Sequence, residues 1–168
     1  MVQFTAVLDN FNTRLWSYHI KVPYQIARSF LDNDHKRVIV SINGDGSHHM
    51  GIMAAGDDVY FLNMNAEIRK KHGIEVGSQV EILLKPDDSK YGMPMPEELE
   101  AVLNEDEEFS NYFDLLTPGK KRNLIYIINK TKNSDKRIEK ALIIGDHLSA
   151  YKGKIDFKAL NASLKKGR

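Results

Sequence analysis

The chain has 168 residues, of which 42% are hydrophobic and 28% charged, and its net charge is +1. This length fits one ordinary domain, or a small domain with a helical extension. It contains no cysteine, which excludes disulfides, thiolate catalysis and Cys-ligated metal centres. No apolar run reaches the roughly 18 residues that span a membrane, and the N-terminal MVQFTAVLDN lacks the pattern of a secretory signal, so we expect a cytoplasmic protein.

The first part of the chain reads as β-rich. Apolar residues alternate over residues 4–8 and again over 16–22, which predicts two half-buried strands. Pro23 opens a short amphipathic helix. The β-branched stretch KRVIVSI is followed by NGDG at Asn43–Gly46, and this turn predicts a hairpin because Asn and Gly tolerate positive φ.

A second group of elements completes this part. VYFLNM (59–64) and SQVEILLK (78–85) predict two more strands. Between them, NAEIRKKHG predicts one helix that Asn65 caps and Gly73 ends in the left-handed conformation. The Pro- and Gly-rich residues 86–96 mark a boundary.

Beyond that boundary the chain reads as helical, and its charges are segregated. Residues 91–119 carry eight carboxylates and no Lys or Arg, whereas residues 120–168 carry 14 Lys or Arg and four carboxylates. We predict a domain at 1–92 and a helical segment at 93–168. The sequence thereby indicates an α+β protein.

The stretch 120–140, with eight Lys or Arg against two carboxylates, has three interpretations. The one we favour is that it packs beside the acidic helices of residues 97–114, each surface ion pair contributing at most ~1 kcal/mol. The second is an anion or nucleic-acid surface, with the candidate residues Arg122, Lys130, Lys132, Lys136 and Arg137. The third, a membrane surface, is disfavoured because polar residues interrupt the apolar face.

Sites of catalysis or metal binding are not indicated. His48 and His49 are adjacent, but neighbours in a strand point to opposite faces, so the two rings should not converge on one ion. The glycine-rich turns match no phosphate-binding loop, and no serine-hydrolase motif occurs. We therefore expect no catalytic residues, no metal and no cofactor.

The small-molecule site that the sequence supports best is an aromatic pocket. Trp16 and Tyr18 lie in one predicted strand and Tyr60 in another. Their alternating placement would allow the side chains to face inward and line a pocket. For Trp16 itself, we favour a position in the core of a β-barrel over a role in ligand binding.

Two segments resemble known families. EIRKKHGIEVGSQVEILLKPDDSKYGMPMPEEL is similar to the carboxyl half of the domain of unknown function 1905, through Gly73, Gly77, the alternating strand and a Met-Pro before a helix. FDLLTPGKKRNLIYIINKTKNSDKRI resembles the YdeI/OmpD-associated, or bacteriocin-protection, family, through its Pro118, a later basic residue and an Arg-Ile pair.

The resemblance implies a small N-terminal double-split β-barrel followed by an all-helical C-terminal segment. It carries no established catalytic residues, and its names refer to resistance against cationic peptides and bacteriocins. We therefore expect a non-enzymatic binding or adaptor protein in stress or cationic-peptide resistance, with an unknown small molecule or protein as partner and without membrane insertion. The alternative is a nucleic-acid-binding regulator that uses the basic helices. Monomer and homodimer both stay open.

Overall fold

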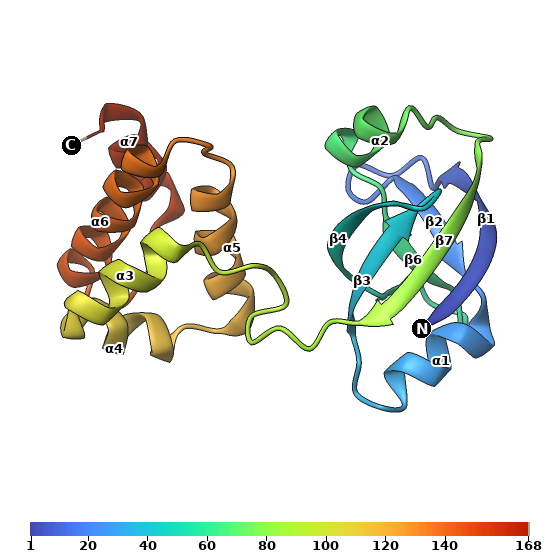
Figure 1. Cartoon of the computed structure of the whole chain (residues 1–168), viewed down its shortest axis with the longest axis horizontal. Coiled ribbons are helices and arrows are strands. Elements are labelled where there is room, and N and C mark those ends of the chain that lie inside the picture. The colour runs from blue at the N-terminus through green and yellow to red at the C-terminus, as the bar shows by residue number, and fades with distance from the viewer. Residues whose placement is uncertain (168) are drawn as a thin grey trace. The chain divides into compact units, whose positions relative to one another are not determined.

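A computed structural model describes residues 1–167 (Figure 1). The chain divides into two compact units, Met1–Asp88 and the part from Ser89 onward. The first, called the barrel unit below, is a curled sheet with two short helices. The second, called the helical unit, is built from helices. The predicted α+β class is confirmed.

The sheet of the barrel unit is antiparallel throughout, with the strand order β4-β3-β7-β1-β2-β6-β5. Its strands are β1 (Val2–Asn10), β2 (Tyr18–Val22), β3 (Arg37–Ile42), β4 (Asp45–Gly51), β5 (Met53–Ala54), β6 (Tyr60–Asn63) and β7 (Gln79–Pro86). Strand β1 joins the two halves, because its first residues pair with β7 and its last three pair with β2. The sheet curls at this shared strand (Figure 1).

The alternation seen in the sequence places one face of each strand in the core of the barrel. On β3 and β7, every second residue is buried, and helices α1 (Tyr24–Leu31) and α2 (Ala66–His72) add further apolar side chains. The fully buried members of this core are Leu8, Ile20, Ala27, Val38, Val40, Ile42, Leu62, Met64, Ile82 and Leu84. Burial of such side chains contributes about 1.5–3 kcal/mol each, so the core holds the barrel together.

Two local signals in the sequence have the predicted effect. Asn43 and Gly44 both adopt positive φ, 51° and 76°, as the tight hairpin between β3 and β4 requires. At α2, the Asn65 side chain accepts a hydrogen bond from the Ile68 N–H, and Gly73 ends the helix with φ 59°. Local capping chemistry was therefore sufficient to predict this helix.

The helical unit contains α3 (Glu97–Glu105), α4 (Glu107–Leu115), α5 (Pro118–Asn129), α6 (Ser134–Ala150) and α7 (Phe157–Lys166). Asp106 separates α3 from α4 and caps α4, since its carboxylate accepts a hydrogen bond from the Phe109 N–H. The helices pack around a second apolar core, whose fully buried members are Leu99, Phe109, Leu124, Ile125, Ile128, Ala141, Ile144, Leu148 and Leu160. Each unit thus has a core of its own.

The prediction for Trp16 was wrong in two respects. The residue is not in a strand, because β1 and β2 are joined by an irregular segment in which Trp16 has φ 54°. Its side chain is 53% exposed, so it is not a core residue. The aromatic ring that packs at this end of the barrel is Phe11, which stacks on His19 with 3.4 Å between ring centroids.

Candidate functional site: an acidic-rimmed groove

A groove of about 530 Å³ lies between α3 and α6 in the helical unit and is called the α3–α6 groove below. The two helices lie against each other (Figure 1). The lining residues are Glu97, Glu98, Ala101, Val102, Glu105, Asp106, Ser134, Ile138 and Leu142. The residues from Glu97 to Glu105 lie on α3, and those from Ser134 to Leu142 lie on α6. Asp106 lies between α3 and α4.

The floor of the groove follows from helical spacing. On α6, Ser134, Ile138 and Leu142 recur every fourth residue and therefore share one face. On α3, Ala101 and Val102 face them. Ile138 is 39% exposed, so this floor is apolar surface that the unit's own core leaves uncovered.

The rim of the groove is acidic. Glu97 and Glu98 lie in the first turn of α3, where negative charge favours the helix. Glu105 ends α3 and Asp106 follows it. Three of these four residues, all but Glu98, are exposed. The groove therefore combines an apolar floor with a concentration of negative charge.

Glu98 is the rim residue that contacts α6. Its own backbone N–H, the Ser134 side chain and Arg137 all stabilise the carboxylate and lower the pKa of Glu98. Arg137 Nη1 lies 3.5 Å from Glu98 Oε2. This pair ties α3 to α6 at one end of the groove, whereas Glu97 and Glu105 keep their charge available to solvent.

The residues predicted as a basic surface do not form one uniform patch. Arg137 donates hydrogen bonds to the Thr131 carbonyl and to Glu98, so part of its charge is used inside the unit. Arg122 is half-buried on α5, and the Lys130 ammonium lies 5.1 Å from the Tyr126 ring. Lys130, Lys132 and Lys136 are exposed. Pairing with the acidic helices is thus seen at Arg137, and these three lysines are surface cations.

The three aromatic residues predicted to line a pocket lie apart. Tyr18 starts β2 opposite Met64, whereas Tyr60 starts β6 opposite Val22. The two tyrosines are therefore at opposite ends of one ladder, about 13 Å apart along the strand. The Arg69 guanidinium covers the Tyr18 ring at 3.6 Å. With Trp16 exposed in the connecting segment, the three side chains do not share a wall.

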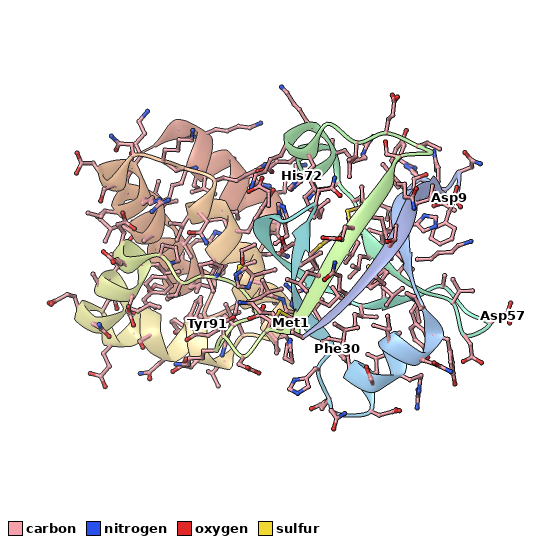
Figure 2. The ribbon with its side chains drawn as sticks, turned by 45° about the vertical axis from the view of Figure 1, so that its right-hand side comes forward. Met1, Asp9, Phe30, Asp57, His72 and Tyr91 are labelled. Atoms are coloured by element: carbon pink, nitrogen blue, oxygen red, sulfur yellow. The ribbon has the colours of Figure 1, made fainter. Side chains whose placement is uncertain are left out.

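The histidine pair on β4 is divided between two faces. His48 Nε2 lies 2.7 Å from His72 Nε2 on α2, a residue labelled in Figure 2. His49 Nδ1 lies 2.8 Å from Asp87 Oδ2, whose side chain is fully buried. In residues 1–167, no group of three or more potential ligands is placed to hold a metal ion. In the same range, no helix has the length and hydropathy to cross a bilayer.

The fold and the groove define a two-part α+β protein with a small barrel and a helical bundle. Residues 4–84 match the family of the domain of unknown function 1905. Residues 93–150 match the family described as Bacteriocin-protection, YdeI or OmpD-Associated. The two matches lie in the order that the sequence predicted. No curated protein matches the chain.

The groove was not predicted from the sequence, although its acidic rim was visible there. In the sequence, the eight carboxylates of residues 91–119 indicate partners for the basic helices. The missing signal was Ile138 with Leu142, an apolar pair at helical spacing beside polar residues. Which face of α6 would be left uncovered depends on helix packing, and this packing is not encoded in a local pattern.

Proposed function

We propose that this protein is a non-enzymatic binding protein whose α3–α6 groove holds cationic, amphipathic peptides. A peptide with an apolar stripe flanked by Lys or Arg matches the groove in both respects. Its apolar side chains would cover Ile138, Leu142 and Val102, and its cations would lie beside Glu97 and Glu105. This helix-in-groove arrangement is a common mode of peptide recognition.

The observation that carries the proposal is the coincidence of apolar floor and acidic rim in one groove. An exposed apolar surface rimmed by polar residues is typical of a protein-interaction site. The sign of the rim selects among partners, because opposite charges steer association and like charges oppose it. A peptide of negative charge is therefore disfavoured.

The family match supports the same function. The matched segment, residues 93–150, includes the whole of α3 and α6 and therefore every residue of the groove. Its description names protection against bacteriocins, and a groove that sequesters cationic peptides would provide such protection. The lining residues contribute carboxylates, one hydroxyl and aliphatic groups, which offer a bound peptide both negative charge and apolar surface.

The test uses a fluorescent peptide of about 18 leucines and lysines, five turns of an amphipathic helix. Fluorescence anisotropy should give an affinity that weakens with salt, since charges contribute to it. The double variant Glu97→Lys/Glu105→Lys should weaken binding at least about tenfold, which corresponds to ~1.4 kcal/mol. Ile138→Arg should have a similar effect by placing a cation on the floor.

The control is Glu100→Lys, which makes once, on the exposed part of α3 outside the groove, the charge change that the rim variant makes twice. A peptide of the same composition with leucine and lysine alternating should bind less well, because it has no helical apolar stripe. Equal losses in Glu100→Lys and in the rim variant would mean that net charge alone drives the binding, and the groove proposal would fail.

A further inference from the structure

Part of β1 in the barrel unit has a partner strand on one side only. Residues Val2–Val7 pair with β7, but the pairing with β2 includes only Leu8–Asn10. Figure 2 shows β1 running between Met1 and Asp9 beside β7. The N-terminal half of β1 is therefore an edge strand, although the whole strand lies in the middle of the strand order.

The direction of the backbone groups on this edge follows from the hydrogen bonds at its end. Leu8 N–H donates to the Ser78 carbonyl on the β7 side, whereas Phe11 N–H donates to the Ser17 carbonyl on the β2 side. Backbone groups alternate in direction along a strand. The backbone N–H and C=O groups of the even-numbered residues of β1 thus point to β7. Those of Gln3 and Thr5 point to the open side. Within residues 1–167, no strand is paired with them there.

A groove of about 450 Å³ lies along this edge. Its lining includes Thr5, Val7 and Pro23, together with Val76 from the segment before β7. Val7 and Val76 are 50% and 53% exposed. The edge thus offers unpaired backbone groups next to two apolar side chains.

We propose that the open half of β1 is a strand-addition site, which takes an extended, uncharged peptide segment with apolar side chains at alternate positions. The backbone of such a segment would form hydrogen bonds with the outward-pointing N–H and C=O groups of Gln3 and Thr5, as in known cases of β-strand addition. One of its side chains would pack against Val7 and Val76. The flexible segment of a partner protein is the occupant that fits.

Charge and size support this choice of occupant. Asp9 and Lys21 at the end of the groove are 4.0 Å apart and offset each other's charge, so the edge selects no charged partner, unlike the α3–α6 groove. Two open strand residues are also far fewer than the roughly 20–30 residues per side of a stable interface between folded proteins. A second copy of the chain would therefore not be held here. The proposal does not depend on the function proposed for the helical unit.

The first test is hydrogen–deuterium exchange of single amides, followed by NMR, on the full chain. In the free protein, Phe4 and Ala6 should exchange slowly and Gln3 and Thr5 quickly. The probe is an end-blocked heptapeptide of alternating valine and threonine at up to about 1 mM. Its addition should slow exchange at Gln3 and Thr5 by at least about tenfold, because these amides become hydrogen-bonded.

The second test uses proline, which removes one N–H and is tolerated only where that group is unpaired. Thr5→Pro should fold and should weaken binding of the heptapeptide at least about tenfold. Ala6→Pro, one residue away, should unfold the barrel because it removes a hydrogen bond to β7. Three results would overturn the proposal: unfolding of Thr5→Pro, slow exchange of Gln3 and Thr5 before any peptide is added, or unchanged exchange at the highest peptide concentration.

Discussion

The barrel unit and the helical unit distribute their charges differently. Residues 1–90 carry ten Lys or Arg and eleven carboxylates in mixed order. Among the Lys, Arg, Asp and Glu residues of the helical unit, α3 and α4 carry only carboxylates, α5 and α7 carry only Lys or Arg, and α6 carries both signs. Both units bury a histidine, His19 in the barrel unit and His147 in the helical unit, but the barrel unit also buries a carboxylate, Asp87, beside His49. In the helical unit, the carboxylates of α3 and α4 are mostly exposed.

This difference indicates where stability and binding lie. In the helical unit, the ion pair that joins the acidic helices to α6 is Glu98–Arg137, in the described range 89–167. One such pair contributes at most ~1 kcal/mol, so the apolar core and not charge pairing holds these helices together. The exposed carboxylates of Glu97 and Glu105 are then available for a partner, which is why we assign the peptide site to this unit.

The largest expected effect comes from truncating the two cores separately. Leu124→Ala in the helical unit and Ile82→Ala in the barrel unit both remove fully buried side chains. Each should reduce the free energy of unfolding by about 2–5 kcal/mol. Urea unfolding followed by NMR should assign the loss from Leu124→Ala to helical resonances first. Loss of both units together at one urea concentration would contradict the view that each unit is stabilised by its own core.

A smaller effect is expected when the buried carboxylate of the barrel unit is removed. In Asp87→Ala, the His49 ring loses the acceptor at 2.8 Å, and an unsatisfied polar group of this kind costs about 1–3 kcal/mol. Asp88→Ala is the matched control, since its side chain is exposed one residue further on. Thermal unfolding should distinguish the two, and equal melting temperatures would show that the buried contact contributes nothing.

The barrel unit should also lose stability in acid because of His48. Burial and the neighbouring His72 and Lys71 lower the pKa of His48, while Asp45 and Glu67 act in the opposite direction. The unfolded chain, with a His pKa near ~6.5, therefore binds more protons than the folded chain in this window. Stability falls as the pH drops from about 6.5 to the lower, folded pKa of His48, and no further loss comes from this group below it.

The contact at 2.7 Å between His48 and His72 gives this pH effect a structural cause. One ring has to donate and the other has to accept, so the contact is lost when both are protonated. His48→Gln should flatten the dependence of the unfolding free energy on pH just below about 6.5. If the unfolding free energy of this variant still depends on pH in this range, then His48 is not the cause of the acid sensitivity.

The smallest expected effect is at Trp16. Because its side chain is 53% exposed, Trp16→Phe should change the free energy of unfolding by no more than about 0.5 kcal/mol. The emission of this single tryptophan should be typical of a solvated ring. A large loss of stability, or emission typical of a buried ring, would return Trp16 to the barrel core.

The sequence predicted those features that depend on local chemistry. Asn65 and Gly73 determine both ends of α2, and the NGDG turn determines the β3–β4 hairpin. Trp16 was mispredicted because its spacing matches a strand while the backbone turns back through positive φ. Such a bend depends on contacts of the neighbouring residues, here Ser17 with Asn10 and Phe11 with His19.

The features with functional interest depend on contacts distant in sequence. The α3–α6 groove brings residue 97 beside residue 138, and the open edge of β1 follows from where its ladder with β2 stops. The basic residues show the same dependence. Arg137 was predicted as part of an anion surface, but its guanidinium is held by Thr131 and Glu98. Composition alone could not separate it from Lys132 and Lys136.

The most direct test of the account is an NMR titration of the full chain with the leucine–lysine peptide, observing backbone amides. The account predicts that the largest shifts lie along α3 and the first half of α6, around Glu97, Val102, Ile138 and Leu142. In a parallel titration, duplex DNA should shift these amides little. Any binding of the DNA should weaken steeply as the salt concentration rises. Peptide-induced shifts confined to other helices, or DNA-induced shifts centred on Lys132 and Lys136 that persist at physiological salt, would contradict it.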